Sequence, residues 1–238
     1  MKGFGVLAAA AAMLAGCQGE AAQSQATRAA DAARPVVVEL FQSQGCSSCP
    51  PANANLNAIA DRPDVLALSF AVTYWDDLGW KDTFARDAYT ARQWDYAHGL
   101  HHANVFTPQM VVNGRRDLVG VNAADVDAAV RSAGSPAGAA LSVSAGQVSI
   151  AAGPAPASGA DVWLVRYDPR VQQVAIKRGE NGGRTLPHRN IVRELTRLGA
   201  WTGKAASFRL PAAPDPALKT AVLVQTTHGG PILGAIRG

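Results

Sequence analysis

Residues 36–51 read VVVELFQSQGCSSCPP, and this stretch decides the fold. Its apolar, β-branched first half favours a buried strand at 36–41. The two prolines are followed by a segment of helical composition at 52–60, and a second apolar run at 65–72 predicts another buried strand. The order of strand, Cys-x-x-Cys, helix and strand is a βαβ pattern. It predicts an α/β domain with the cysteine pair between its first strand and its first helix.

Cys46 and Cys49 have the spacing and the setting of a thioredoxin-like redox site. Cysteines three positions apart at a strand–helix turn reach disulfide geometry without displacing the backbone. Because a helix N-terminus stabilises a thiolate, we expect Cys46 to attack and Cys49 to resolve the mixed disulfide. The pair predicts a thiol–disulfide oxidoreductase that needs no soluble cofactor, with a direction of electron flow that the motif does not fix.

The segment at about 74–103 is predicted to be a largely helical insertion, and it contains three tryptophans. We place Trp75, Asp76 and Trp80 in a candidate substrate groove, and Asp76 is a candidate proton shuttle. Two other interpretations stay open for the tryptophans. They form the core of the insertion, or they form a platform for a peptide or a glycan.

Thr107-Pro108 precedes an apolar strand and an Asn113-Gly114 turn. A return strand at 116–121 and a helix capped by Asn122 follow. This order resembles the thioredoxin superfamily, whose cis-proline lies before a strand and faces the cysteine pair. The resemblance implies that Thr107 and Pro108 shape the substrate groove. An ordinary trans proline at the start of a strand is the alternative.

The chain also resembles an uncharacterised family of secreted bacterial thioredoxin-like proteins, a domain of unknown function with a Gly-Cys-Ser-Ser-Cys-Pro-Pro motif. The matching segments are Glu39-Leu40-Phe41, Gln44 to Pro51, Tyr74-Trp75-Asp76, Leu78-Gly79-Trp80, Arg92-Gln93, Thr107-Pro108-Gln109, His188-Arg189-Asn190 and Leu198-Gly199. The resemblance covers nearly all of the chain after residue 34. It implies the fold and no particular activity.

Two departures from a typical thioredoxin lie beside the cysteines. Gly45 replaces an aromatic residue, and Pro50-Pro51 follows the second cysteine. A residue before proline avoids the α region, so we expect Cys49 and Pro50 outside the helix and a helix start at Pro51. Cys46 would then lie farther from the helix dipole, and its thiolate would be less activated than in thioredoxin.

The pattern of predicted elements changes after a linker rich in Gly, Ser and Pro at 132–138. Strands are predicted at 141–150 around an Ala145-Gly146 turn, 162–167, 171–176, 191–198, 205–210 and 221–227. Regular short strands with Gly and Pro turns indicate a small β-sandwich-like domain. We therefore expect a thioredoxin-like domain at 35–134 and a β-rich C-terminal domain at 139–238.

The N-terminus has the pattern of an export signal, with an apolar stretch too short to span a bilayer. Residues 14–17 read Leu-Ala-Gly-Cys and resemble the bacterial lipobox. The resemblance implies a signal peptide at 1–16, lipidation of Cys17 and anchoring at the periplasmic face of the cell envelope. Gln18 after the cysteine favours the outer membrane. An ordinary secretory signal with an incidental cysteine is the alternative.

Residues 17–34 are rich in Ala and Gln and are predicted to be a flexible tether. If Cys17 carries lipid, Cys46 and Cys49 are the two cysteines that remain, and they lie in an oxidising compartment. We therefore expect protein thiols or disulfides of the envelope as partners, with the membrane contacted through the lipid. The net charge is +4 without a run of Lys or Arg, so no nucleic acid is expected.

Two other functions use the same residues. The cysteine pair supplies half of a tetrahedral copper or zinc site, and three histidines at helical spacing would complete it. The candidate ligands are Cys46, Cys49, His98, His101 and His102. The other alternative is a non-enzymatic binding module with a structural disulfide, although a bridge over so short a loop restrains little of the unfolded chain.

Overall fold

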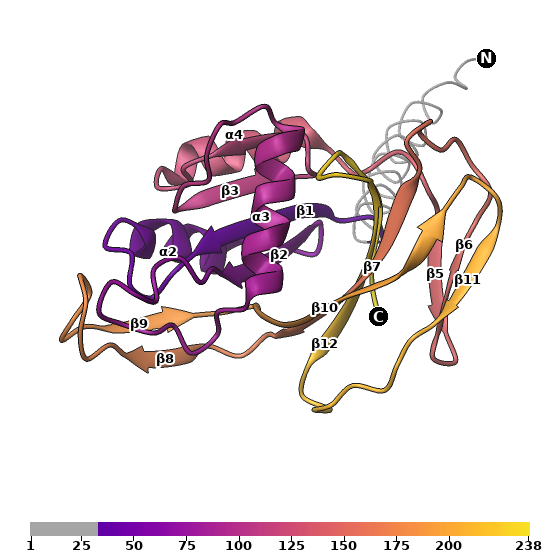
Figure 1. Cartoon of the computed structure of the whole chain (residues 1–238). Helices are drawn as coiled ribbons and strands as arrows, with labels where there is room; N and C mark the ends of the chain where they lie inside the picture. The colour runs from indigo at the N-terminus through magenta and orange to yellow at the C-terminus, as the bar shows by residue number, and fades with distance from the viewer. Residues whose placement is uncertain (1–32) are drawn as a thin grey trace, which may run out of the picture.

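The structure is a computed structural model that describes residues 33–238, and it is a mixed α/β protein built on one eight-stranded sheet (Figure 1). The strands of this sheet are β1 (Val36–Gln42), β2 (Val65–Ala71), β3 (Gln109–Val112), β4 (Arg116–Leu118), β7 (Ala160–Asp168), β10 (Ile191–Trp201), β12 (Lys219–Thr226) and β13 (Ile232–Arg237). Their spatial order is β13-β12-β7-β10-β2-β1-β3-β4. The predicted signal peptide at 1–16, Cys17 and nearly all of the predicted tether at 17–34 lie outside the described residues.

The remaining elements flank this sheet. The helices are α2 (Cys49–Ile59), α3 (Asp87–Gly99) and α4 (Ala123–Ala133). A second sheet contains β5 (Leu141–Ser144), β6 (Gln147–Ile150) and β11 (Ala206–Arg209), and a two-stranded hairpin contains β8 (Gln172–Ala175) and β9 (Thr185–His188). None of the helices within residues 33–238 has the length and apolar character that crossing a membrane requires.

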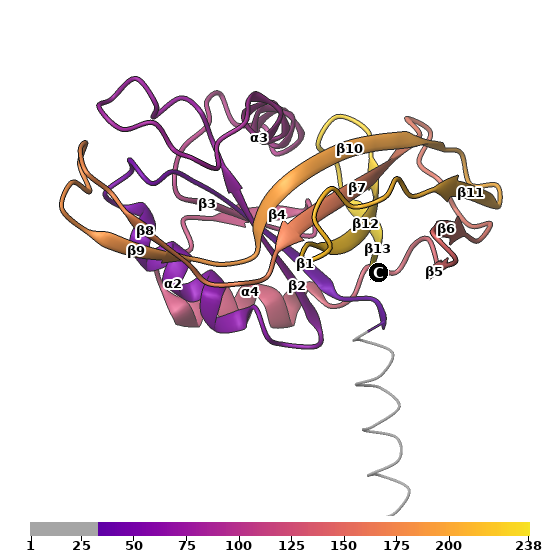
Figure 2. The same ribbon diagram turned by 90° about the horizontal axis from the view of Figure 1, so that it is seen from below.

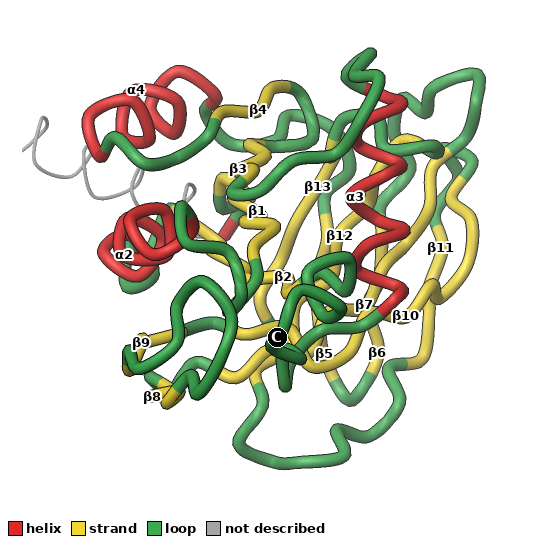
Figure 3. Tube along the Cα trace, turned by 60° about the vertical axis from the view of Figure 1, so that its left-hand side comes forward, coloured by secondary structure: helices red, strands yellow, loops and turns green. Residues whose placement is uncertain are grey.

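Strands β1 and β2 are parallel neighbours at the centre of the sheet, and every residue in them is buried. Helices cover both faces, which is why these strands read as continuous apolar runs rather than as alternating patterns. Helices α2 and α4 lie on one face, and α3 lies on the other (Figures 2 and 3). The predicted strands at 36–41 and 65–72 are confirmed.

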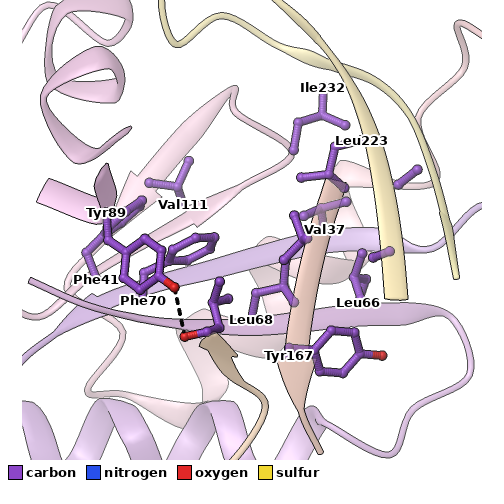
Figure 4. Packing of buried hydrophobic residues seen from close by; sticks show 14 of the residues in the cluster. Val37, Phe41, Leu66, Leu68, Phe70, Tyr89, Val111, Tyr167, Leu223 and Ile232 are labelled. Carbon is purple, nitrogen blue, oxygen red and sulfur yellow. Dashed lines mark hydrogen bonds between the residues drawn. The ribbon is translucent and has the colours of Figure 1, made fainter. Parts of the chain in front are cut away.

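The core on the α3 face joins the two halves of the chain (Figure 4). Phe41 and Phe70 stack with ring centroids 5.3 Å apart, and Tyr89 from α3 meets the Phe70 ring edge-on. The Tyr89 hydroxyl donates a hydrogen bond to the Val192 carbonyl oxygen of β10, the dashed contact in Figure 4. Leu223 from β12 packs in the same cluster. The N-terminal and C-terminal halves therefore share one core.

The C-terminal strands are divided between sheets: β7, β10, β12 and β13 belong to the large sheet, whereas β5, β6 and β11 form the second sheet. The expected separate β-sandwich-like domain at 139–238 stays a prediction. β10 runs parallel to β2, and the contact is made where Ser69 N donates to Asn190 O (2.9 Å) and Asn190 Nδ2 donates to Ala67 O (2.8 Å). The smaller sheet packs on the outer half of the large sheet through a cluster that includes Val148 and Trp201. The strand patterns predict where strands occur but not which neighbours they pair with.

Helix α2 begins at Cys49, so the predicted helix start at Pro51 is wrong. Pro50 and Pro51 occupy the first turn of the helix. A proline is tolerated there because the N–H groups of the first turn have no partner within the helix. Cys49 is therefore part of the helix, and Cys46 lies in the turn directly before it.

Candidate functional site

Cys46 and Cys49 form a disulfide at the point where β1 leads into α2. Their Cα atoms are 5.4 Å apart. Both residues are completely buried, with 0% relative exposure, whereas Ser47 and Ser48 between them are exposed. The hydroxyl of Ser48 lies 3.4 Å from Cys46 Sγ. The predicted pairing of the two cysteines is thus present, but the sulfurs are covered.

The Cys loop, defined here as residues 43–49, is held by the segment that precedes α3. The main-chain nitrogen of Gln44 donates to Asp82 Oδ2 (2.7 Å). Trp80 Nε1 donates to Gln44 Oε1 (2.8 Å), and Gln44 Nε2 donates to Thr83 Oγ1 (3.2 Å). Both the main chain and the side chain of Gln44 are therefore fixed, two positions before the first cysteine.

Trp75 connects the Cys loop with Thr107. A Cβ atom added at Gly45 would lie 3.6 Å from Trp75 Cβ, and Trp75 Nε1 donates to Thr107 Oγ1 (2.8 Å). The Thr107–Pro108 peptide bond is cis. Gln109 pairs with Phe41 in the β1–β3 ladder, so Pro108 lies at the end of β1 from which the Cys loop departs. The structure thus brings Thr107, Pro108 and Trp75 to the end of the sheet that carries the cysteines.

A second segment covers the Cys loop from the C-terminal half of the chain. The cap loop, defined here as residues 176–184, joins β8 to β9 beside α2 (Figure 1). Asn181 is completely buried, and its Nδ2 donates to the main-chain oxygens of Gln44 (2.9 Å) and Cys46 (2.8 Å). Glu180 Oε2 accepts a hydrogen bond from Ser47 N (3.0 Å). The sequence predicts only a Gly-rich turn here, and no signal in it indicates these contacts.

Asp82 is the buried carboxyl group beside the Cys loop. Burial raises the pKa of Asp82 to about 6, although hydrogen bonds from the Gln44 and Phe84 main-chain nitrogens act in the opposite direction. Asp76 Oδ1 accepts a hydrogen bond from Asp82 N (3.0 Å), so Asp76 supports this turn. Its role as a proton shuttle stays a prediction.

A cavity of about 980 Å³ opens beside these carboxylates. Its lining includes Tyr74, Asp76, Asp77, Lys81, Asp82 and Arg86. Trp75 and Trp80 are not among its lining residues, and their indole nitrogens donate to Thr107 and Gln44. Of the three residues predicted for the substrate groove, Asp76 therefore faces this cavity and the two tryptophans support the Cys loop.

A buried ion pair lies in the core behind the site. Glu39 in β1 is completely buried, and its carboxylate accepts two hydrogen bonds from Arg92 in α3 (2.7 and 3.1 Å). The Tyr96 hydroxyl donates to the same carboxylate. The Arg92 guanidinium also lies over the Phe70 and Tyr96 rings, which are favourable positions for a cation. This cluster fixes α3 to β1, the strand that leads into the Cys loop.

The predicted metal ligands are not brought together. Within residues 33–238 there is no cluster of three His, Cys, Asp or Glu side chains that fits a metal ion. Only His98 belongs to α3, because the helix ends at Gly99 and His101 has a left-handed backbone conformation (φ 62°). His102 Nε2 contacts Asp117 Oδ2 instead (2.9 Å). The three histidines therefore do not share one face of a helix, which the predicted metal site requires.

Residues 37–225 match the family model described as "Protein of unknown function (DUF1223)". The chain belongs to this family. An X-ray crystal structure of a protein from Agrobacterium tumefaciens is similar to this DUF1223 protein, with 34% sequence identity and a TM-score of 0.69. The similarity covers 85% of this chain and 92% of the Agrobacterium chain. No curated protein matches the chain.

Proposed function

We propose that this DUF1223 protein is a thiol–disulfide oxidoreductase of the cell envelope with a thioredoxin-like domain at 35–134. The observation that carries the proposal is the disulfide between Cys46 and Cys49 at the N-terminus of α2. The strand order β2-β1-β3-β4, with β1 parallel to β2 and antiparallel to β3, supports the thioredoxin-like assignment. The position of Pro108 at the same end of the sheet supports it further.

The proposed reaction exchanges one disulfide for another. In the reduced protein, the Cys46 thiolate attacks a partner disulfide and forms a mixed disulfide, and the second partner sulfur leaves as a thiolate that takes up a proton. The Cys49 thiolate then attacks Cys46 Sγ, which restores the Cys46–Cys49 bond and releases the first partner sulfur as a thiolate. The partner gains two electrons, and the cysteine pair loses two. A partner dithiol drives the same steps in reverse.

The short separation of the cysteines favours a redox role over a stabilising one. A cross-link between positions 46 and 49 closes a very small loop, so it removes little conformational entropy from the unfolded chain. The N-terminus of α2 supplies N–H groups and partial positive charge beside Cys46, which stabilise a thiolate. Both features favour a disulfide that is repeatedly reduced and reoxidised.

The complete burial of the two cysteines favours a second candidate, a binding module with a structural disulfide. A partner sulfur can reach Cys46 only after the cap loop or the Cys loop moves. The reduction potential separates the two candidates, because structural disulfides lie below about −300 mV and catalytic dithiols lie between about −120 and −270 mV.

The proposed location rests on the N-terminal motif at 14–17. We propose that the chain is exported, that Cys17 is lipidated, and that the protein is anchored to the periplasmic face, in the outer membrane. Partners are then protein thiols or disulfides of the envelope. Substitution of Cys17 by Ser should move the protein from the detergent-extracted membrane fraction to the soluble fraction, and an unchanged distribution would contradict the anchor.

The deciding experiment is the reduction potential of the pair in the full-length protein, with bound copper and zinc measured on the same sample. We expect a potential between about −120 and −270 mV and no stoichiometric metal. A potential below about −300 mV would support the structural disulfide and rule out the oxidoreductase. Metal that blocks thiol alkylation would support the metal-binding alternative.

A further inference from the structure

A carboxylate from a distant part of the chain binds the turn directly before α2. Glu180 Oε2 lies 3.0 Å from Ser47 N, although the two residues are 133 positions apart. The first turn of α2 contains no acidic residue, and the N-cap residue Ser48 makes no capping hydrogen bond through its side chain. Ser47 precedes the N-cap residue, so Glu180 places its negative charge just outside the N-terminus of α2, where the helix dipole favours an anion.

Cys46 lies in the same turn, directly before α2. When the disulfide is reduced, the negative charge on Cys46 Sγ is stabilised by the N–H groups and the partial positive charge at the start of α2. Glu180 already accepts the N–H of the residue next to Cys46. A second negative charge close by disfavours ionisation, because two like charges share one electropositive site.

The position of Glu180 is well defined. Asn181, the next residue, is completely buried and is bound to the main-chain oxygens of Gln44 and Cys46. Arg184 donates to Asn181 Oδ1 (2.7 Å) and holds the amide in this orientation. The hydrogen bond to Ser47 lowers the pKa of Glu180, so its carboxylate is negatively charged throughout the pH range in which thiols titrate.

We infer that Glu180 is a positioning residue of the cap loop that disfavours the Cys46 thiolate and favours the disulfide form of the pair. This inference rests on the proposed oxidoreductase function. Because Glu180 is exposed to solvent, its influence should weaken as the salt concentration rises. The C-terminal half of the chain thereby sets the reactivity of a site whose cysteines lie in the N-terminal half.

The test compares Glu180→Gln with the full-length wild type and with Glu194→Gln. Glutamine keeps the size and an acceptor oxygen but removes the charge. Glu194 in β10 accepts a hydrogen bond from Thr196 and offers the same change of charge without a hydrogen bond to the Cys loop. The rate of iodoacetamide alkylation against pH gives the apparent pKa of Cys46, and equilibration with glutathione gives the redox equilibrium constant.

For Glu180→Gln we expect a lower apparent pKa of Cys46 and alkylation that is about two- to fivefold faster at neutral pH. We expect a shift of similar size in the equilibrium toward the dithiol form. Both effects should shrink at about 1 M salt, and Glu194→Gln should behave as the wild type. A Glu180→Gln protein that matches the wild type in both measurements at low salt would overturn the inference.

The outcomes for Glu180 and for the proposed function are separable. A wild-type potential below about −300 mV, together with a shifted Cys46 pKa in Glu180→Gln, would contradict the oxidoreductase function but support the effect of Glu180 on Cys46. A wild-type potential in the catalytic range, with no effect of Glu180→Gln, would support the oxidoreductase function and contradict the inference about Glu180.

Discussion

Asn181 Nδ2 donates a hydrogen bond of 2.8 Å to the main-chain oxygen of Cys46, across 135 positions of sequence. The same amide group binds the main-chain oxygen of Gln44. These two bonds fix the turn that leads into the disulfide to the loop between β8 and β9. The surroundings of Cys46 are therefore built from both halves of the chain.

Substitution of Asn181 by Ala should open the site and weaken the fold. The change removes the side-chain donor of the Gln44 and Cys46 carbonyl oxygens, and Cys46 O keeps only the bond from Cys49 N (3.2 Å), so we expect a loss of about 1–3 kcal/mol in the free energy of unfolding. It also loosens the cap loop over the cysteines. We expect reduction of the disulfide by tris(2-carboxyethyl)phosphine to be faster than in the wild type. Stability is measured by urea unfolding, and an unchanged reduction rate would mean that the cap loop does not limit access.

Cys49→Ser should trap the proposed intermediate. Without the resolving thiol, the Cys46 thiolate forms a mixed disulfide with glutathione or with a partner protein that is not released. Mass spectrometry under non-reducing conditions should detect this adduct. The matched variant Cys46→Ser should form far less of it, because the remaining thiol lies within α2. Equal adduct formation by the two variants would contradict the assignment of Cys46 as the attacking residue.

Two buried groups should have opposite effects on stability between about pH 4 and 6.5. Burial raises the pKa of Asp82 to about 6, compared with 3.8 in the unfolded chain. The contribution of Asp82 to the free energy of unfolding is therefore complete below pH 3.8 and is lost as the pH rises through 6. Burial lowers the pKa of His188 to about 4, compared with 6.5 in the unfolded chain. The contribution of His188 to the free energy of unfolding is therefore complete above pH 6.5 and is lost as the pH falls toward 4. Each shift corresponds to about 3 kcal/mol.

The variants Asp82→Asn and His188→Phe separate these two contributions. With asparagine at 82, the free energy of unfolding should rise with pH from 4 to 6.5, because the contribution of His188 is then no longer opposed by that of Asp82. With phenylalanine at 188, the free energy of unfolding should fall over the same range. Urea unfolding at pH 4, 5, 6 and 7 measures both slopes. Asp77→Asn, an exposed carboxylate in the same cavity, is the control and should follow the wild type.

Arg92→Met should be among the most destabilising changes on the α3 face. It leaves the Glu39 carboxylate completely buried without its counter-ion, which costs about 3–5 kcal/mol. The double variant Glu39→Gln with Arg92→Met should be more stable than Arg92→Met alone, because no charge is left unpaired. Thermal unfolding of the three proteins tests this order. A double variant that is less stable than the single one would show that the pair itself, rather than the unpaired charge, accounts for the loss.

Much of the site's framework is predictable from sequence because it depends on local chemistry. The continuous apolar runs predict β1 and β2, and the Cys-x-x-Cys spacing predicts the disulfide. The Asn113-Gly114 turn is confirmed by positive φ at both residues, and Asn122 caps α4 by accepting a hydrogen bond from Ala124 N. Each of these features is decided within a few positions of the residues that signal it.

The rest depends on contacts between distant segments. The contacts of Glu180 and Asn181 with the Cys loop bridge more than 130 positions, and the Gly-rich sequence around them indicates only a turn. The sequence does not predict strand β9, because it contains Pro187 and a proline in a short segment argues against a strand. The pairing of β10 with β2 is likewise not predictable from sequence, because an apolar strand indicates that it is buried but not which strand lies beside it.

The pairing of β10 with β2 also determines how the chain tolerates shortening. A protein that ended near residue 134 would leave β2, buried along its whole length in the intact chain, as the outermost strand of a four-stranded sheet. Unpaired main-chain groups on an apolar edge strand are a template for association with other chains. In the intact chain β10 occupies this edge, so the C-terminal half protects β2 from association with other chains.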